Sequence, residues 1–290
     1  SLLDKDTFVS TIQNKHTALE KFNPDEFLVG LIGGKIGGFI HFGKYDKQKS
    51  STIWHDKPPQ TTGSIFFFVV APKFRKKSLG SELWKHAMSA LSDCERVIID
   101  WQCINPFYGN SDVPKPVLYG SPEGPGIPET DKETIQFLEK RGFRKSGTFL
   151  QMRYEIDSPI DSTAEDFVLL KHSLPLLNKS LHDSIVHAKA CYESLVFVSG
   201  GKVRGYITYF PMLEDNSVWG IYRFEIDECE LGKGVGKKLL CNAINNIWRY
   251  GGKFLDTVTI PTISQSAYGL YARMGFKEIQ RWCSFDDYTF

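Results

Sequence analysis

The sequence lacks an excess of charge of either sign. It has 35 lysine and arginine residues against 34 aspartate and glutamate residues, so its formal net charge over 290 residues is only +1. A protein whose main partner is DNA or RNA needs a clear basic excess to bind phosphates. We therefore expect no nucleic-acid partner. The content of 41% hydrophobic and 24% charged residues is typical of a globular protein.

Long apolar runs and closely paired cysteines are missing as well. No run approaches the roughly 20 apolar residues that span a bilayer, so we expect no membrane partner. The opening residues SLLDKDTFVS lack the basic-then-apolar pattern of a secretory signal, which together with the scattered cysteines favours a cytoplasmic location. No CxxC pair or histidine cluster at metal-ligand spacing occurs, so we expect no metal site. The six cysteines are Cys94, Cys103, Cys191, Cys229, Cys241 and Cys283.

What the sequence does contain is an internal repeat. Three patterns each occur twice, in the same order: a hairpin that turns at Gly-Gly, a strand that runs through a basic glycine-containing turn into a helix, and a short helix closed by Gly-Phe. The pairs are FLVGLIGGKIGGFIHF (27–42) with SLVFVSGGKVRGYITY (194–209), residues 64–91 with 218–248, and FLEKRGF (137–143) with LYARMGF (270–276). Three matches in order predict a duplicated unit.

The spacing between the two copies shrinks along the chain. Offsets of 167, 156 and 133 residues join the paired glycines, which are Gly33 and Gly200, Gly80 and Gly236, and Gly142 and Gly275. The first copy therefore holds extra residues, which we assign to the polar stretch Lys44–Gly63 and the long loop Asn105–Asp131. That loop either roofs a pocket or is a surface excursion packed by its own aromatic residues. We predict two domains, 1–157 and 158–290, divided in the proline-bearing stretch Asp157–Ala164.

The loop LGKGVGKK (231–238) has the features of an anion site. Gly234 and Gly236 let the backbone approach a ligand closely, and free N–H groups at the helix start near Val235 attract negative charge. Three lysines crowd this helix start, where the helix dipole disfavours cations unless an anion lies among them. The spacing fits neither a P-loop nor the dinucleotide-binding fingerprint. It predicts a phosphate site, with a solvated glycine-rich turn as the alternative.

These motifs together resemble the GNAT (GCN5-related) N-acetyltransferases. The signature of that family is Arg/Gln-x-x-Gly-x-Gly/Ala before a helix, followed later by a tyrosine four residues ahead of Gly-Phe, and the likeness covers both halves of the chain. It implies an α/β (α+β) fold of two tandem GNAT-like domains. Each would be a mixed, mostly antiparallel sheet flanked by helices, with two central strands splayed apart to admit acetyl-CoA.

The resemblance assigns roles to residues of the second half. It implies that the backbone of Phe224 and Ile226 pairs with the pantetheine arm of acetyl-CoA, and that Tyr271 is the general acid; a core tyrosine is the alternative. Ser264 replaces a common Asn at a helix start beside the cofactor. The residues implied to hold the pyrophosphate are Leu231, Gly232, Lys233, Gly234, Val235, Gly236 and Lys237.

The match to the family pattern is incomplete. Leu231 stands where the family usually has Arg or Gln. In the first half Arg75 matches, but Ser78 replaces the first glycine and Leu138 replaces the catalytic tyrosine. We therefore interpret 1–157 as a degenerate GNAT-like domain and 158–290 as the domain that binds acetyl-CoA.

The resemblance implies an acyl-CoA-dependent N-acyltransferase. An acetyl group would pass to a small-molecule or peptide amine by direct attack in a ternary complex, which requires a base or a water chain to take the amine proton. The histidines His172, His182 and His187 lie in a region where a substrate could sit. Candidate bases are Glu225, Asp227, Glu228 and Asp256. The alternative is a catalytically silent acyl-CoA-binding sensor or interaction protein; the sequence leaves the oligomeric state open.

Overall fold

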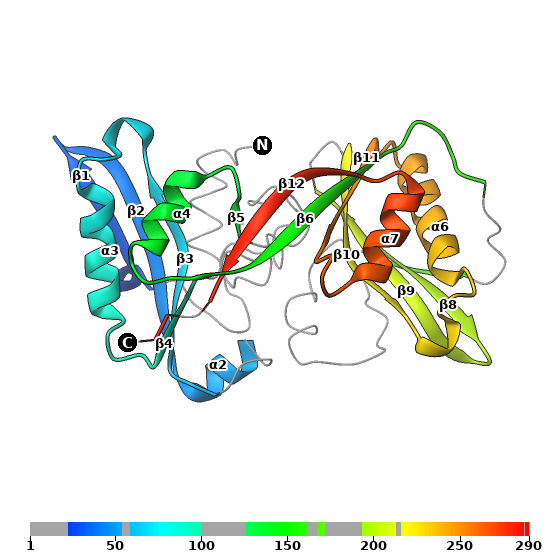
Figure 1. Ribbon diagram of the computed structural model, residues 1–290, viewed down its shortest axis with the longest axis horizontal. Coiled ribbons are helices and arrows are strands. Elements are labelled where there is room, and N and C mark those ends of the chain that lie inside the picture. The colour runs from blue at the N-terminus through cyan, green and yellow to red at the C-terminus, as the bar shows by residue number, and fades with distance from the viewer. Residues whose placement is uncertain are drawn as a thin grey trace.

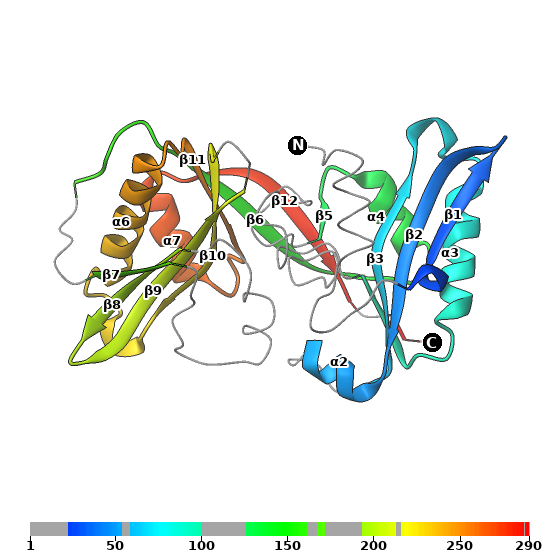
Figure 2. The ribbon, with the colours of Figure 1, turned by 180° about the vertical axis from the view of Figure 1, so that it is seen from behind.

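The chain forms two lobes, each built on one sheet with helices beside it (Figures 1 and 2). Two long strands run side by side between the lobes. This mixed α/β architecture with two sheets confirms the predicted fold class. The computed structural model describes residues 23–53, 59–99, 126–161, 167–171, 193–212, 216–286 and 288–289.

The first lobe contains a four-stranded sheet in the order β1-β2-β3-β4. Its strands are β1 (Phe27–Ile32), β2 (Lys35–Tyr45), β3 (Thr62–Val70) and β4 (Arg96–Ile99). The β1–β2 and β2–β3 pairs are antiparallel, whereas β3–β4 is parallel. The helices of this half are η1 (Pro24–Glu26), α2 (Lys47–Ile53), η2 (Pro72–Phe74), α3 (Leu79–Ala90) and α4 (Lys132–Glu139). Apolar residues of α3 and α4 pack against the sheet in one core cluster.

The second sheet has eight strands in the order β5-β12-β6-β11-β10-β9-β8-β7; it begins beside the first lobe at β5 and extends into the second lobe (Figure 1). Among the described strands, only the β10–β11 pair of this sheet is parallel. The strands are β5 (Ile127–Pro128), β6 (Lys145–Glu155), β7 (Phe167–Lys171), β8 (Glu193–Ser199), β9 (Lys202–Pro211), β10 (Val218–Ile226), β11 (Phe254–Thr259) and β12 (Lys277–Phe285). The helices are η3 (Glu228–Glu230), α6 (Val235–Arg249) and α7 (Gln265–Met274), and α6 and α7 share one core cluster with the sheet.

Both hairpins predicted from the repeat are confirmed. β1 and β2 turn at Gly33 and Gly34, and β8 and β9 turn at Gly200 and Gly201. The φ angles of these glycines are 56° and 72° in the first turn and 57° and 70° in the second. A two-residue turn with both central residues left-handed matches the twist of paired strands, and glycine adopts it without strain.

The third repeat extends beyond the Gly-Phe motif. Residues 127–143 and 260–276 align without a gap, and both segments begin with Ile-Pro. Each contains a helix, α4 or α7, that is followed by a glycine with a left-handed φ, 91° at Gly142 and 96° at Gly275. The two halves therefore share this whole segment, and the extra residues of the first copy lie before it.

Strand β6 precedes residue 157 but lies in the second sheet. It pairs with β11 from Leu150 to Glu155 and with β12 on its other side, so it separates two strands of the second half (Figure 1). In return, Tyr288 near the chain end bridges Val97 of β4 through hydrogen bonds of 2.7 and 2.8 Å. Strand β6 of the first half thus joins the second sheet, and Tyr288 of the second half bridges the first sheet, across the predicted boundary at residue 157, which itself stays a prediction.

This mutual contribution extends to the two hydrophobic cores. Leu150 and Met152 of β6 are buried in the core of the second lobe. Cys283 of β12 is fully buried in the core of the first lobe, where Phe285 and Tyr288 also pack. Each core therefore includes side chains that the sequence repeat assigns to the other half.

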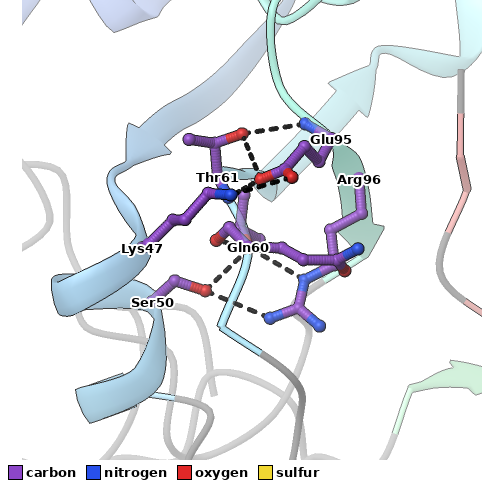
Figure 3. A network of polar contacts seen from close by, with 7 residues as sticks. Lys47, Ser50, Gln60, Thr61, Glu95 and Arg96 are labelled. Carbon is purple, nitrogen blue, oxygen red and sulfur yellow. Dashed lines mark hydrogen bonds and ion pairs between the residues drawn. The ribbon is translucent and has the colours of Figure 1, made fainter.

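A polar network fastens α2 to the first sheet (Figure 3). Arg96 at the start of β4 is buried; its Nε donates to Thr62 Oγ1 (2.8 Å) and its Nη2 donates to Ser50 Oγ (3.1 Å). Closer to solvent, Lys47 Nζ donates to Glu95 Oε1 (3.0 Å). Ser50 and Lys47 both belong to α2, so these contacts hold that helix against the ends of β3 and β4.

Several predictions fall wholly or partly outside the described residues. These are residues 54–58 of the stretch Lys44–Gly63, the loop Asn105–Asp131 as far as residue 125, the stretch Asp157–Ala164 after residue 161, the histidines His172, His182 and His187, and the cysteines Cys103 and Cys191. Within the described ranges, no helix combines the length and hydropathy needed to cross a membrane. The four described cysteines are free thiols.

Candidate functional site

Strands β10 and β11 separate partway along their length. They pair in parallel only from Val218 with Phe254 to Gly220 with Asp256. Beyond this point β11 continues beside β6 as far as Thr259, while β10 continues beside β9. From Ile221 onward, one edge of β10 therefore has no strand partner in the described part of the chain.

Phe224 and Ile226 direct their backbone groups toward this open edge. Asp227 N donates to Arg204 O of β9 (2.8 Å). In an antiparallel ladder the direction of the backbone N–H and C=O groups alternates from residue to residue. Glu225 therefore also faces β9, and the groups of Phe224 and Ile226 face away from it. An extended ligand can pair with them as an added strand does.

The loop after β10 holds two glycines in left-handed conformations. Gly232 has a φ of 77° and Gly234 a φ of 82°, and Gly234 is the cap of α6. A Cβ atom added at either position would meet nothing within 4 Å. The space beside the loop is open, so a ligand can approach its backbone.

The first turn of α6 presents N–H groups that the backbone leaves unused. Lys238 N donates to Gly234 O (3.0 Å), which is the first bond of the helix. Among the described residues, no backbone acceptor binds the N–H groups of Val235, Gly236 and Lys237. Such groups, together with the helix dipole, favour the binding of an anion. The side chains of Lys237 and Lys238 are exposed beside it.

Four of the predicted site residues meet beside β10. A Cβ atom added at Gly236 would lie 3.5 Å from Phe224 and from Leu270, and 3.7 Å from Ile226. Tyr271 is only 3% exposed, and its ring centroid lies 6.3 Å from that of Phe224. The start of α6, the middle of α7 and the open strand therefore converge at Phe224, Ile226, Gly236 and Tyr271.

The other predicted residues lie around this centre. Leu231 is 60% exposed, and Lys233 forms an ion pair with Glu230 (3.3 Å). The side chain of Val235 is buried in the core, so only its N–H group can reach a ligand. Ser264 caps α7 without a hydrogen bond from its side chain to the helix, which leaves its hydroxyl available at the helix start.

Three of the carboxylates considered as general bases are engaged in ion pairs. Asp227 accepts from Arg204 Nη1 (2.8 Å) and from Cys229 N (3.1 Å), and the bond from Arg204 is the main cause that lowers the pKa of Asp227 to about 2. So acidic a group is a weak base. Glu225 pairs with Arg223 (3.1 Å), and Glu228 is exposed in η3. The third carboxylate in an ion pair is that of Asp256, which is fully buried and pairs with Arg153.

Asp256 belongs to a network of hydrogen bonds between side chains that the sequence analysis did not predict. Its carboxylate accepts from Arg153 Nε (2.6 Å), from Arg153 Nη2 (2.8 Å) and from Gln151 Nε2 (2.9 Å). Gln151 Oε1 accepts in turn from Trp282 Nε1 (3.0 Å). These residues come from β11, β6 and β12, and Asp256 belongs to the last pair before β10 and β11 part. No sequence motif indicates this network, because its residues come together only through the placement of β6 between β11 and β12.

The first half repeats the loop geometry without the glycines. At an offset of 156 residues, Lys76 and Ser78 occupy the positions of Gly232 and Gly234. Their φ angles of 58° and 64° are also left-handed. Leu138, at the position of the tyrosine, is fully buried and offers no hydroxyl group. The first-half loop therefore has the same left-handed conformation without the glycines that favour it.

In the first-half loop, more polar groups form contacts within the protein than in the second-half loop. Leu79 N, at the start of α3, donates to Lys77 O (2.9 Å). Glu133 of α4 forms an ion pair with Lys76 (2.8 Å) and a longer one with Arg75 (3.6 Å). A carboxylate thus sits among the basic residues where an anionic ligand would bind. The second half has Ser266 at the position equivalent to Glu133.

The second-half site suits a ligand with an extended amide-containing arm and a diphosphate. The open edge of β10 supplies backbone partners for the arm, and the uncovered glycines with the free N–H groups of α6 supply the anion site. Acetyl-CoA has both parts. No group of three or more His, Cys, Asp or Glu residues in the described ranges is placed to hold a metal ion.

Comparisons with solved structures find the same fold over most of the chain. A tandem GNAT protein from the clavulanic acid biosynthesis pathway aligns with a TM-score of 0.62 at 13% identity, covering 92% of this chain and 84% of that one. A GCN5-related N-acetyltransferase from Sphaerobacter thermophilus aligns with a TM-score of 0.58 at 14% identity, covering 90% and 80%. At such identities the likeness establishes the fold alone.

The family assignment rests on the sequence of both halves. No curated protein matches the chain. The model of the acetyltransferase (GNAT) family, however, matches residues 2–106 and again residues 158–276. Two matches that together cover most of the chain, on a fold shared with a tandem GNAT protein, show that this protein belongs to the GNAT acetyltransferase family.

Proposed function

We propose that this protein transfers an acetyl group from acetyl-CoA to an amine, and that the chemistry takes place in the C-terminal half. Membership of the GNAT family supports acyl-CoA-dependent N-acyl transfer in general. The observation that carries the finer proposal is the open edge of β10, with the Gly234 loop at one end and Tyr271 beside it. The first half has no tyrosine at the equivalent position.

Different residues of the second half bind different parts of the cofactor. The backbone of Phe224 and Ile226 holds the pantetheine arm, and Ser264 contacts it from the start of α7. The loop from Leu231 to Lys237 holds the pyrophosphate through its N–H groups and lysines. When bound, acetyl-CoA supplies a thioester whose carbonyl group an amine can attack.

Two groups of the chain then serve the transfer. The N–H group of Ile226, on the open edge of β10, donates to the carbonyl oxygen as that oxygen gains negative charge. Tyr271 Oη donates a proton to the departing sulfur. Because Asp227, Glu225 and Asp256 are held in ion pairs, the proton of the attacking amine passes to water rather than to one of them.

The acceptor is a small-molecule or peptide amine, and the proposed location is the cytoplasm. The free thiols of the four described cysteines support a reducing compartment. A second candidate function is an acyl-CoA-binding sensor without turnover. Leu231, Ser78 and Leu138 favour it, because each departs from the family pattern at a functional position.

The duplicated loop provides a matched test of cofactor binding. Calorimetric titration of acetyl-CoA should show one site in the wild type and no binding to Gly234→Glu, because the added carboxylate fills the anion site. Ser78→Glu places the same side chain in the first half and should leave binding unchanged. Gly234→Ala controls for backbone strain at the same φ. Loss of binding in Ser78→Glu alone would move the cofactor site to the first half.

Turnover separates the transferase from the sensor. With a panel of amines, Tyr271→Phe should lower kcat at least about 100-fold, because a positioned acid contributes a factor of that order. The dissociation constant of acetyl-CoA should stay within about twofold, since the ring remains in place. Binding by the wild type without turnover on any amine would favour the sensor.

A further inference from the structure

A pocket of about 230 Å³ lies beside the part of β3 that extends past its pairing with β4. Phe67 and Phe68 of β3 form one side, β5 and the start of α4 form another, and Trp282 of β12 completes the wall. Strand β3 pairs with β4 only as far as Ile65, so the pocket lies beyond that pairing. It is therefore built from both halves of the sequence.

This pocket lies at positions equivalent to those beside the open edge of β10 in the second half, but its lining differs. Phe68 is equivalent to Phe224, and Asp131 at the start of α4 is equivalent to Ser264. The route that a diphosphate would take is obstructed, because Glu133 pairs with Lys76 at the neighbouring loop (2.8 Å). A ligand without phosphates suits this site better.

The size and lining of the pocket point to a small apolar body. Its walls are mainly aromatic and aliphatic, from Phe67, Phe68, Ile127 and Trp282. A cavity of about 150 Å³ with apolar walls can hold a benzene molecule. A volume of about 230 Å³ therefore accepts a single ring with a short substituent, or a short branched chain.

Among the described residues that line the pocket, Asp131 alone carries a charge. Its two carboxylate oxygens each accept one hydrogen bond from Thr134, from the backbone N (3.1 Å) and from Oγ1 (2.7 Å). A carboxylate has about four acceptor positions, so roughly two remain for a ligand. In the described part of the chain, no Lys or Arg forms an ion pair with Asp131. The neighbouring aromatic rings also attract a cation.

The wall formed by Trp282 is fixed before a ligand arrives. Trp282 is 6% exposed, and its Nε1 donates to Gln151 Oε1 (3.0 Å). Gln151 is held in turn by Asp256 (2.9 Å). A rigid wall lowers the entropy lost on binding, which favours a preformed site.

We propose that this pocket binds a small primary amine with an aromatic or branched aliphatic body. The ammonium group donates hydrogen bonds to Asp131, and the apolar body lies between Phe67, Phe68 and Trp282. The site lies outside the acyl-transfer centre proposed for the second half and does not depend on it.

The experiment compares two probes of nearly the same shape on the full chain. Calorimetric titration with benzylamine and with benzyl alcohol, without acetyl-CoA, should show benzylamine binding at least about tenfold more tightly, because only benzylamine forms a charge-assisted hydrogen bond. Asp131→Asn should remove this preference. Asparagine caps helices as well as aspartate does, so α4 should stay folded. Glu133→Gln removes a nearby carboxylate that does not line the pocket and should leave both affinities unchanged.

Two further measurements locate the site. Benzylamine should shift the indole N–H resonance of Trp282, assigned with Trp282→Phe. It should bind equally to Gly234→Glu, whose cofactor site is blocked. Equal affinity for the two probes, no effect of Asp131→Asn, or an unmoved Trp282 resonance would overturn the proposal. Loss of benzylamine binding in Gly234→Glu would also overturn the proposal, because it would place the amine at the transfer centre. Failure of acetyl-CoA to bind the wild type would contradict the proposed function but not this amine site.

Discussion

His41 lies fully buried in β2, between the rings of Phe27 and Phe66 at centroid distances of 5.5 and 5.1 Å. Burial lowers the pKa of this imidazole from 6.5 to about 3. Between these two values the unfolded chain binds a proton that the folded protein does not. Stability should therefore fall as the pH falls from about 6.5 toward 3, by up to about 1.4 kcal/mol per pH unit from this residue alone.

Urea unfolding of the wild type and of His41→Gln between about pH 7 and pH 4 measures this contribution. The variant should lose stability at neutral pH but show a shallower dependence on pH. His86→Gln, on an exposed position of α3, serves as the control and should retain the slope of the wild type. Parallel curves for the wild type and His41→Gln would contradict the assignment.

At the scale of the element, the equivalent loops before α3 and α6 allow serine and glycine to be exchanged between Ser78 and Gly234. Ser78 has a φ of 64° and Gly234 a φ of 82°, so both positions require the left-handed region. That region costs a residue with a Cβ roughly 1–2 kcal/mol, partly offset by the greater freedom of glycine in the unfolded chain. Ser78→Gly should therefore stabilise the protein by about 0.5–1 kcal/mol, and Gly234→Ser should destabilise it by a similar amount.

Urea unfolding midpoints at constant pH check both changes. Lys73→Ala, in η2 outside the left-handed positions, should have little effect and serves as a control. A shift of the same sign for both exchanges would show that the two loops do not share a conformational requirement.

Elements whose form depends on local chemistry could be predicted from the sequence. The Gly-Gly pairs encode the two hairpin turns, and the glycines after Leu231 encode the cap of α6. The family pattern singled out Tyr271 and Phe224 separately, and the structure places their rings close together. The hydrogen-bond network that joins Arg153, Asp256, Gln151 and Trp282 could not be predicted, because it depends on the pairing of strands more than 100 residues apart. The pocket beside β3 was missed for the same reason.

At the scale of the whole molecule, strand β6 makes the halves depend on each other. A fragment of residues 158–290 lacks β6, so β11 and β12 would both expose unpaired edges and the buried Asp256 would lose Arg153. Unpaired edges promote aggregation, and a buried charge without its partner is strongly destabilising. We expect this fragment to show no cooperative unfolding transition and to aggregate.

A fragment of residues 144–290 retains β6 in its place and is the matched comparison. It should be more soluble and show a sharper unfolding transition by circular dichroism than residues 158–290. Equal, cooperative unfolding of the two fragments would show that β6 is dispensable for the second lobe.

The contribution of each half to the other's sheet limits how this protein can evolve. Because β6 lies between β11 and β12, and Tyr288 bridges β4, neither half can be deleted without damaging the other. The first half is thus needed for the fold although Leu138 stands where the family pattern has a tyrosine. Mutations that would be eliminated in a single-copy enzyme could accumulate there, and the pocket beside β3 was free to acquire a ligand of its own.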